Sequence, residues 1–359
     1  MNEDIKKVLN KLIDEGYQAY IVGGYVRDYL LKVNSFDVDI ATNAKPNVLM
    51  DIFPNASSNN YGGITFKLGD YTYDITTFRK ELSYEDRRPN EFVYVSSIEE
   101  DAVRRDFTIN AIYMDVDNNI IDLYAGASDL INKTVRIIGN INDRLVEDPL
   151  RMLRAIRFKV LYGFDIEDNL LTYIKQNKEL IKSLSYTRRK EELDLIIESN
   201  NRIEGLKYIK ELNLEDVLEI SIPDDIKDST APIVMWAQIK ADNYSFTKNE
   251  LAIINDIKTI IEYGIIDNII LYRYGIYTVQ LASDILEVSH GYVSDIYKEM
   301  PIYTNKDIDI TTDEILDLLD IEPGSILKDI YNDLEIKILS NELDNNHEEL
   351  IKYIKDNWR

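Results

Sequence analysis

A strand–glycine–helix–strand pattern near the N-terminus restricts the fold more than any other feature of the chain. The apolar run Tyr20–Val22 predicts a buried strand, and it stops at Gly23 and Gly24, after which a helical pattern begins. The next predicted strand carries Asp37 and Asp39. Because side chains at positions i and i+2 of a strand point to the same face, we expect both carboxylates on one patch beside the glycine turn.

The residue types in this unit suit phosphate chemistry. Glycines at the turn let backbone N–H groups approach an anion, and the helix start that follows favours negative charge. Arg27 adds a guanidinium group that binds phosphate through two parallel hydrogen bonds. Carboxylate oxygens are the ligands that Mg²⁺ prefers, so the pattern indicates metal-assisted phosphoryl or nucleotidyl transfer. Taken alone, the same residues are compatible with an ordinary turn beside a solvated acidic face.

Length and composition set the broad class of the protein. A chain of 359 residues exceeds one compact core, so two or more domains are expected. The absence of cysteine excludes disulfides, thiolate catalysis and cysteine-based zinc sites, and two histidines, His290 and His347, do not make a histidine-rich metal site. The charged N-terminus is unlike a signal peptide, and no apolar run approaches the ~20 residues of a membrane span. We therefore expect a cytoplasmic protein.

The charge is distributed unevenly along the chain. The formal net charge of -24 argues at first against a nucleic-acid partner, because RNA affinity rests largely on neutralising phosphates. Residues 129–190, however, hold 13 Lys and Arg against 8 Asp and Glu. A basic band inside an acidic chain is able to bind RNA, and we expect Arg188, Arg189 and Lys190 to contact it. The alternative is a chance cluster of solvated helix faces.

The periodicity of apolar residues divides the chain into two halves. Up to about residue 136, short strands alternate with helices; strands are predicted at 19–22, 36–41, 64–68, 71–78, 120–123 and 135–138, and helices at 5–13, 26–31, 47–53 and 127–131. From about residue 142 onward, 3.6-residue periodicity dominates. The sequence therefore predicts a mixed α/β head followed by an almost entirely helical second half.

Two further motifs carry candidate binding residues. In the first, Arg104 and Arg105 suit a triphosphate, and Asp106 is able to accept a hydrogen bond from a ribose hydroxyl; the alternative is a helix end capped by Asp106. In the second, Asp148 precedes Arg151 by about one helical turn, so both side chains can reach one planar ligand. The alternative there is a salt bridge at a helix N-terminus.

An acceptor beside a donor fork matches particular bases. Cytosine and adenine each offer an exocyclic amine next to an acceptor nitrogen, whereas guanine and uracil present the reverse order and would leave buried groups unpaired. Asp148 and Arg151 therefore indicate a site that reads C and A. Arg154 and Arg157 follow at intervals of three and curl around the same helix.

The ordered motifs Gly-Gly-x-Val-Arg-Asp, Asp-x-Asp, Arg-Arg-Asp-Phe-Thr-Ile-Asn-Ala and Glu-Asp-x-x-Arg resemble those of the class II tRNA nucleotidyltransferase and poly(A) polymerase family, specifically the bacterial CCA-adding enzymes. The resemblance runs from residue 19 to about 189. It implies an α+β fold, with a polymerase-beta-like head at 1–138, a helical neck with the base-reading helix at 139–205, a helical body at 206–298 and a helical tail at 299–359.

The resemblance also implies a role for each matching residue. The substrates would be tRNA, CTP and ATP, and the enzyme would add C, C and A to the tRNA 3′ end with Mg²⁺ as cofactor; we expect a monomer. The metal ligands would be Asp37 and Asp39, supplemented by Asp74. The nucleotide-binding residues would be Gly23, Gly24, Arg27, Arg105, Asp106, Asn110, Asp148, Arg151, Arg154 and Arg157.

Residues 80–89 are expected to form a flexible loop whose Asp86, Arg87 and Arg88 act as a lever on the neck. This segment is about a residue shorter than in CCA-adding relatives and lacks their glycine, so a CC-adding enzyme is an alternative, as are an A-adding enzyme and a poly(A) polymerase. From other classes, the chain could be an RNA-binding protein without catalysis or an enzyme that transfers nucleotides to a small molecule. The intact Asp37 and Asp39 pair argues against the first, and the basic neck argues against the second.

Overall fold

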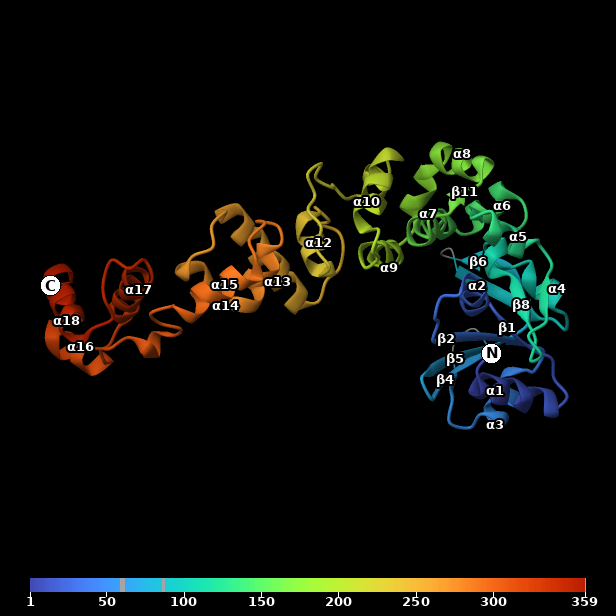
Figure 1. The fold of residues 1–359 in the computed structure, drawn as a ribbon, viewed down its shortest axis with the longest axis horizontal. Helices are drawn as coiled ribbons and strands as arrows, with labels where there is room; N and C mark the ends of the chain where they lie inside the picture. Colours follow the sequence, from blue (N-terminus) through green and yellow to red (C-terminus); the bar gives the residue numbers. More distant parts are fainter. Residues whose placement is uncertain (59–61, 86–87, 359) are drawn as a thin grey trace. The chain divides into compact units, whose positions relative to one another are not determined.

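The structure is a computed structural model that describes residues 1–58, 62–85 and 88–358. The chain divides into two compact units, Met1–Glu219 and Ile220–Arg359 (Figure 1). The first unit contains all the motifs singled out above. The finer division into head, neck, body and tail stays a prediction.

The first unit is built around a mixed seven-stranded sheet with the order β3-β4-β5-β2-β1-β8-β9. Its strands are β1 (Ala19–Val22), β2 (Asp37–Thr42), β3 (Ser57–Ser58), β4 (Gly63–Leu68), β5 (Tyr71–Thr77), β8 (Ile112–Met114) and β9 (Ile120–Asp122). Strand β1 pairs antiparallel with β2, and β2 pairs parallel with β5. This register sets Asp39 opposite Val22 on one side and opposite Asp74 on the other.

Short helices surround this sheet (Figure 1). They are α1 (Glu3–Asp14), α2 (Gly24–Leu31), α3 (Pro46–Ile52), α4 (Ile98–Ala102), the 3₁₀ turn η1 (Thr108–Asn110) and α5 (Gly126–Ile131). Helix α1 starts at the side-chain cap of Asn2 and buries Ile5, Val8, Leu9 and Leu12, which recur at helical spacing. Helix α2 begins directly at Gly24, two residues before the predicted start at 26.

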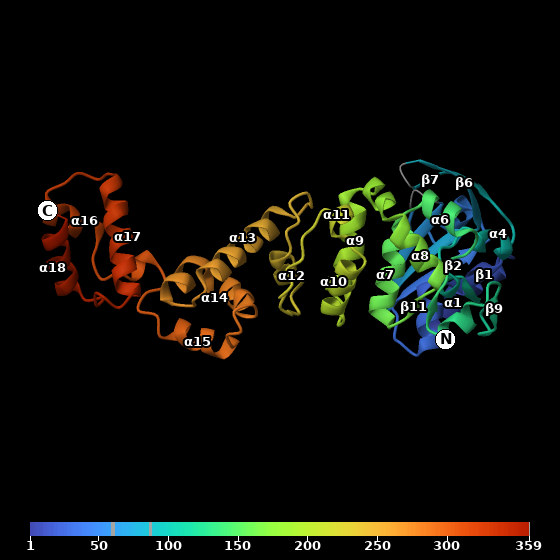
Figure 2. The same ribbon diagram turned by 90° about the horizontal axis from the view of Figure 1, so that it is seen from above.

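Residues 80–89 differ from the expected loop. Strands β6 (Arg79–Glu85) and β7 (Arg88–Tyr94) form an antiparallel hairpin with an irregular register between Glu81 and Tyr84 (Figure 2). Apolar residues Phe92 and Val93 continue this ladder beyond the segment read as a loop, and paired backbone groups satisfy one another in a ladder. Asp86 and Arg87 lie outside the described residues.

A layer of helices follows the sheet within the first unit (Figures 1 and 2). Its elements are β10 (Thr134–Val135), α6 (Ile141–Glu147), α7 (Leu150–Tyr162), β11 (Asp165–Ile166), α8 (Asp168–Gln176), the 3₁₀ helix η2 (Lys178–Ser183), α9 (Tyr186–Ile197), α10 (Arg202–Glu211) and α11 (Glu215–Leu218). Helix α7 packs against α9 and α10. The strand predicted at 135–138 is shorter than expected, because only Thr134 and Val135 pair with β11.

The second unit consists of helices: α12 (Pro232–Gln238), α13 (Lys248–Tyr263), α14 (Asn268–Ser283), α15 (His290–Lys298), the 3₁₀ turn η3 (Asn305–Asp307), α16 (Thr312–Leu319), α17 (Ser325–Leu339) and α18 (His347–Asn357). Capping boxes start α13 at Thr247 and α16 at Thr311. Across the described parts of the chain, every helix is too short or too polar to cross a bilayer. The α+β fold class is thereby confirmed: a mixed sheet precedes a helical remainder.

Candidate nucleotidyl-transfer site

Three carboxylates meet on the central strands of the sheet. Asp37 and Asp39 alternate with the buried residues Val38 and Ile40, so the two side chains stay on the exposed face of β2. Asp74 on β5 is half-buried, lies beside Asp39 in the parallel register and accepts a hydrogen bond from the Thr65 hydroxyl. The structure therefore brings together the three residues that the sequence assigned to the metal site.

The surroundings of Asp39 make its ionised form costly. Partial withdrawal from water by the surrounding protein raises the pKa of Asp39, and the nearby charges of Asp74 and Asp37 raise it further. The Arg105 guanidinium and a hydrogen bond from the Gly24 N–H act in the opposite direction but do not outweigh these effects. The Asp39 side chain is exposed on this face of β2. The neighbouring carboxylates destabilise its ionised form, and a bound cation would stabilise that form.

The glycine turn lies against the same carboxylate. Gly23 has φ +77°, a conformation that L side chains rarely adopt, and a Cβ placed there would lie 2.9 Å from Oδ2 of Asp39. The N–H of Gly24 is directed at Asp39. In this structure the turn therefore positions the carboxylate, and the predicted role of Gly23 and Gly24 in triphosphate binding stays a prediction.

The donor chemistry of the patch fits a small hard cation. Within residues 1–58, 62–85 and 88–358, no three His, Asp or Glu side chains are arranged to enclose a metal by themselves. Mg²⁺ does not need such an enclosure, because it commonly binds through one or two carboxylates and completes its shell with water and substrate phosphates. Asp37 and Asp39, exposed on one face of β2, match that mode.

Arg27 is buried in contacts within the protein. It is 8% exposed, and its guanidinium donates to Asn110 Oδ1 at 2.8 Å, to the Tyr162 hydroxyl at 2.6 Å and to Asp28 Oδ1 at 2.9 Å. The same group lies over the ring of Phe158 with its Cζ 5.2 Å from the centroid. Arg27 therefore ties the head to helix α7 in this structure, and its contact with triphosphate stays a prediction.

Asp106 continues this internal network. Its carboxylate accepts from Arg154 Nε at 2.7 Å and from Asn110 Nδ2 at 3.1 Å. Burial alone would raise the pKa of Asp106, but the Arg154 charge, these hydrogen bonds and the Phe107 N–H hold it well below the usual range. Asp106 is consequently ionised at neutral pH, and Arg27, Asn110, Asp106 and Arg154 form one connected chain of polar contacts.

Asp148 and Arg151 each have partners within the protein. Asp148 lies between α6 and α7, and both its carboxylate oxygens are 3.0 Å from Arg188 Nη2. Arg151 is 6% exposed and donates to the carbonyl oxygens of Arg144 at 3.2 Å and Arg104 at 3.4 Å. Both base-reading candidates thus contact other residues of the protein, and their joint contact with a base stays a prediction.

Within the basic band at 129–190, Arg189 does not have the exposed position predicted for it. Arg189, expected at the RNA surface, is 2% exposed and donates to the carbonyls of Leu184 and Lys182 and to Glu219. A buried guanidinium whose donors serve the protein's own backbone is not placed to meet a phosphate. Lys190 pairs with Asp194 at 2.8 Å.

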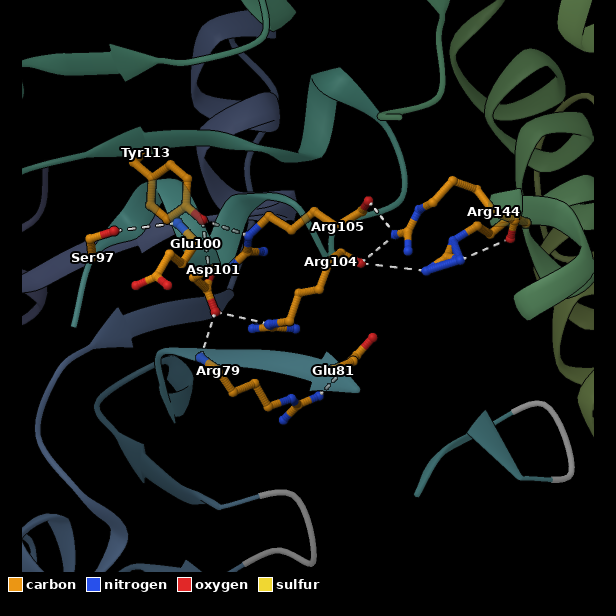
Figure 3. A network of polar contacts seen from close by, with 10 residues as sticks. Arg79, Glu81, Ser97, Glu100, Asp101, Arg104, Arg105, Tyr113 and Arg144 are labelled. Atoms are coloured by element: carbon orange, nitrogen blue, oxygen red, sulfur yellow. Dashed lines mark hydrogen bonds and ion pairs between the residues drawn. The ribbon is translucent and has the colours of Figure 1, made fainter. Parts of the chain in front are cut away.

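Three residues at the site escaped the sequence analysis. Glu192 is 5% exposed and accepts from Arg157 Nε at 2.6 Å, from 35 positions earlier in the chain. Tyr162 receives the hydrogen bond from Arg27 across 135 positions. Neither contact has a local sequence signal. Asp101 is different, because it precedes Arg104 and Arg105 at the helical spacings i+3 and i+4, which predict ion pairs (Figure 3).

Comparison with known proteins shows where this architecture belongs. Residues 19–136 match the Poly A polymerase head domain, residues 163–220 match the RNA and SrmB-binding site of polymerase A, and residues 243–354 match tRNA nucleotidyltransferase domain 2. The CCA-adding enzyme of Lactococcus lactis is 32% identical over 385 residues, covering 98% of this chain and 96% of the relative. The chain belongs to the family of CCA-adding enzymes.

Other relatives and solved structures agree. The CCA-adding enzyme of Staphylococcus haemolyticus is 30% identical and covers 98% of this chain and 97% of the relative. The crystal structure of the Bacillus stearothermophilus CCA-adding enzyme in complex with CTP shares the fold with a TM-score of 0.85 at 24% identity, covering 99% and 98% of the two chains. The Thermotoga maritima enzyme complexed with tRNA has a TM-score of 0.71 at 19% identity, covering 100% and 97%. The predicted family is confirmed, and the protein is a nucleotidyltransferase, a class that generally depends on a divalent metal.

Proposed function

We propose that this enzyme adds C, C and A to the 3′ end of tRNA from CTP and ATP, without a nucleic-acid template and with Mg²⁺ as the metal. The observation that carries the proposal is the Asp37, Asp39 and Asp74 patch beside the Gly23 turn, in a chain that matches CCA-adding enzymes along nearly its whole length. An RNA-binding protein without catalysis has no use for three adjacent carboxylates where RNA phosphates would lie.

The reaction is a displacement at phosphorus. The terminal 3′ oxygen of the tRNA forms a bond to the α-phosphorus of CTP or ATP, and the bond from that phosphorus to the bridging oxygen breaks. Pyrophosphate leaves, and the proton of the 3′ hydroxyl passes to solvent water. Asp37 and Asp39 would hold the Mg²⁺ ions, with Asp74 supporting Asp39. Bound Mg²⁺ supplies charge stabilisation to the attacking and leaving oxygens. The turn at Gly23 fixes the direction of the Asp39 carboxylate.

The remaining assignments concern the nucleotide. Arg105 would hold the triphosphate; its charge and that of Asp39 each favour the charged form of the other, which supports a position near the metal ligands. Asp106 would meet the sugar after Arg154 turns from it. Asp148 and Arg151 would read the base, which requires Arg188 to release the Asp148 carboxylate or to join it at the base.

The link between β6 and β7 is the candidate for the switch from C to A. The same base-reading pair has to accept a purine after two pyrimidines, so a part of the site must reposition once the RNA end has grown. In enzymes generally, segments that reposition commonly complete an active site. The proposed switch residues are Asp86, Arg87 and Arg88.

Sequencing of product ends tests the function. Purified protein is incubated with tRNAs that end before the tail, after the first C and after the second C, with CTP and ATP supplied separately and together. We expect C addition to the first two substrates with CTP alone, A addition to the third with ATP alone, and complete tails with both. Asp39→Asn serves as the control, because it keeps the shape of the carboxylate and removes its charge.

Each alternative predicts a different set of ends. Arrest after the second C with both nucleotides present would identify a CC-adding enzyme. Addition of A only to tRNA that already ends in two C would identify an A-adding enzyme. Runs of several A would identify a poly(A) polymerase, and tRNA binding without any extension would identify a binding protein.

A further inference from the structure

Asp101 on α4 is the most completely enclosed carboxylate around the candidate site. Its side chain is 0% exposed, and four donors from three segments of the chain surround it (Figure 3). Ionised carboxylates are almost never fully buried unless they are paired. The interactions of Asp101 with these donors must therefore offset the free-energy cost of burying its charge.

Two of the contacts of Asp101 converge on one arginine. Nη2 of Arg105 lies 3.2 Å from Oδ2 of Asp101. Nε of Arg105 donates to the Tyr113 hydroxyl at 3.0 Å, and that hydroxyl in turn donates to the same Oδ2 at 2.9 Å. The Arg105 guanidinium also lies over the Tyr113 ring, 5.2 Å from its centroid. Asp101 and Tyr113 together fix both the position and the plane of the guanidinium.

The other oxygen of Asp101 joins two further segments. Oδ1 accepts from Arg104 Nε at 2.9 Å and from the backbone N–H of Arg79 at 3.3 Å. Arg79 is the first residue of β6, so the base of the hairpin rests on the same carboxylate that holds Arg105. Figure 3 shows these groups gathered around Asp101.

The surrounding donors hold Asp101 in its ionised form. Burial acts to raise its pKa, but the positive charges of Arg104 and Arg105 and the hydrogen bonds from Arg104 and Tyr113 outweigh this, so the pKa is lowered. The carboxylate is therefore ionised throughout the neutral range, and it offers only acceptors to its donors. An asparagine in its place would present an N–H₂ group to one of these donors.

We propose that Asp101 is a positioning residue for nucleotide binding: with Tyr113 it aims Arg105 at the triphosphate beside Asp39 and joins that arginine to the base of the β6–β7 hairpin. The inference rests on the proposed function, because it takes Arg105 as the residue that holds the triphosphate. The alternative is that the ion pairs of Asp101 only stabilise the fold of the head. The two possibilities differ in whether the effect of Asp101 on nucleotide binding passes through Arg105.

A double-mutant cycle separates them. CTP and CMP binding to the tRNA-free enzyme is measured for wild type, Asp101→Asn, Arg105→Ala and the double variant. We expect Asp101→Asn to lower the ratio of CTP to CMP affinity about tenfold, the scale of one charge-assisted hydrogen bond. Arg105→Ala should lower it at least as much, and the double variant should show no further loss, because both changes remove the same interaction.

Two further variants guard against effects of misfolding. Asp129→Asn is the matched control: Asp129 is another buried carboxylate of the head that accepts from the Thr108 hydroxyl and pairs with Arg136 at 2.8 Å. It should reduce thermal stability without changing the CTP to CMP ratio. If Asp101→Asn does not fold, Tyr113→Phe removes one hydroxyl bridge and keeps all charges, and it should lower the same ratio about twofold to fivefold.

The outcomes are distinguishable. If Arg105→Ala lowers the ratio while Asp101→Asn and Tyr113→Phe leave it unchanged, the positioning role is overturned and the proposed function stands. Equal losses in Asp101→Asn and Asp129→Asn, or additive losses in the double variant, would also overturn it. If Arg105→Ala itself leaves the ratio unchanged, the assignment of the triphosphate to Arg105 fails, and the role of Asp101 fails with it.

Discussion

Replacing Gly23 by alanine should lower both the thermal stability of the protein and its catalytic rate, through two separate effects. Gly23 combines φ +77° with ψ -137°, and a Cβ at this position would lie 2.9 Å from Asp39 Oδ2. Ordinary contacts begin at 3.4 Å, so the carboxylate has to retreat by about 0.5 Å. The substitution therefore strains the backbone and displaces a proposed metal ligand at once.

The two effects have separate magnitudes. Backbone strain of this kind costs about 1–3 kcal/mol. For a compact unit of this size each kcal/mol lowers Tm by about 2–4 °C, so the melting temperature should fall by roughly 2–12 °C. Because catalytic groups must stay within about 0.5 Å of their working geometry, kcat should fall about tenfold to a hundredfold.

A second glycine provides the matched control. Gly163, which ends α7, has φ +64°, and a Cβ there would meet no atom within 4 Å. Gly163→Ala should therefore lower Tm through strain alone and leave kcat unchanged. Single-turnover C addition at saturating CTP and tRNA, with circular dichroism melting curves, measures both quantities. Wild-type kcat in Gly23→Ala, or an equal loss of kcat in Gly163→Ala, would refute the reasoning.

Further expectations concern the metal, the base, the switch and pH. Asp37→Asn should abolish nucleotide addition while tRNA binding, measured by filter retention, stays within about twofold; near-normal turnover would remove Asp37 from the metal site. Asp148→Ala should raise UTP and GTP incorporation relative to CTP, because each lost base contact costs about 1–3 kcal/mol of discrimination. Arg87→Ala with Arg88→Ala should leave both C additions intact and suppress A addition. Since Asp39 must be ionised to bind a cation and its pKa is raised partly by Asp74, activity should fall with decreasing pH from a higher pH than an ordinary Asp would give, and Asp74→Asn should move this acid limb of the pH profile to lower pH.

The elements whose apolar residues recur with a clear period were predictable from the sequence. Strand β1 occupies the predicted residues, and β2 and β5 are offset by no more than one residue, because their apolar residues mark one buried face. The shared exposed face of Asp37 and Asp39 follows from the same alternation, whereas Asp74 joins them through the pairing of β2 with β5. The hairpin β6–β7 was missed since its first strand, including Lys80 and Glu81, is largely polar and its register is irregular.

The partners of the site residues were not predictable in the same way. Arg27 meets Tyr162, and Arg157 meets Glu192, across distances in sequence that no local spacing encodes. The burial of the basic side chains was not predictable either, because a run of basic residues has the same sequence pattern whether its side chains face solvent or the interior. Asp101 alone had a usable signal, its i+3 and i+4 spacing to Arg104 and Arg105.

The burial of several arginines changes how the positive charge of residues 129–190 is understood. Among the basic residues at 129–190, Arg144, Arg151 and Arg189 are buried, whereas Lys133, Lys175 and Lys182 are exposed. Arginine suits interior positions because its planar group serves several acceptors at once, while lysine keeps a strongly hydrated charge at the surface. The local excess of positive charge is thus partly a scaffold that holds Asp106, Asp148 and Glu192 in place. Within the proposed function, phosphate contacts in this segment are therefore expected from the exposed lysines rather than from the buried arginines.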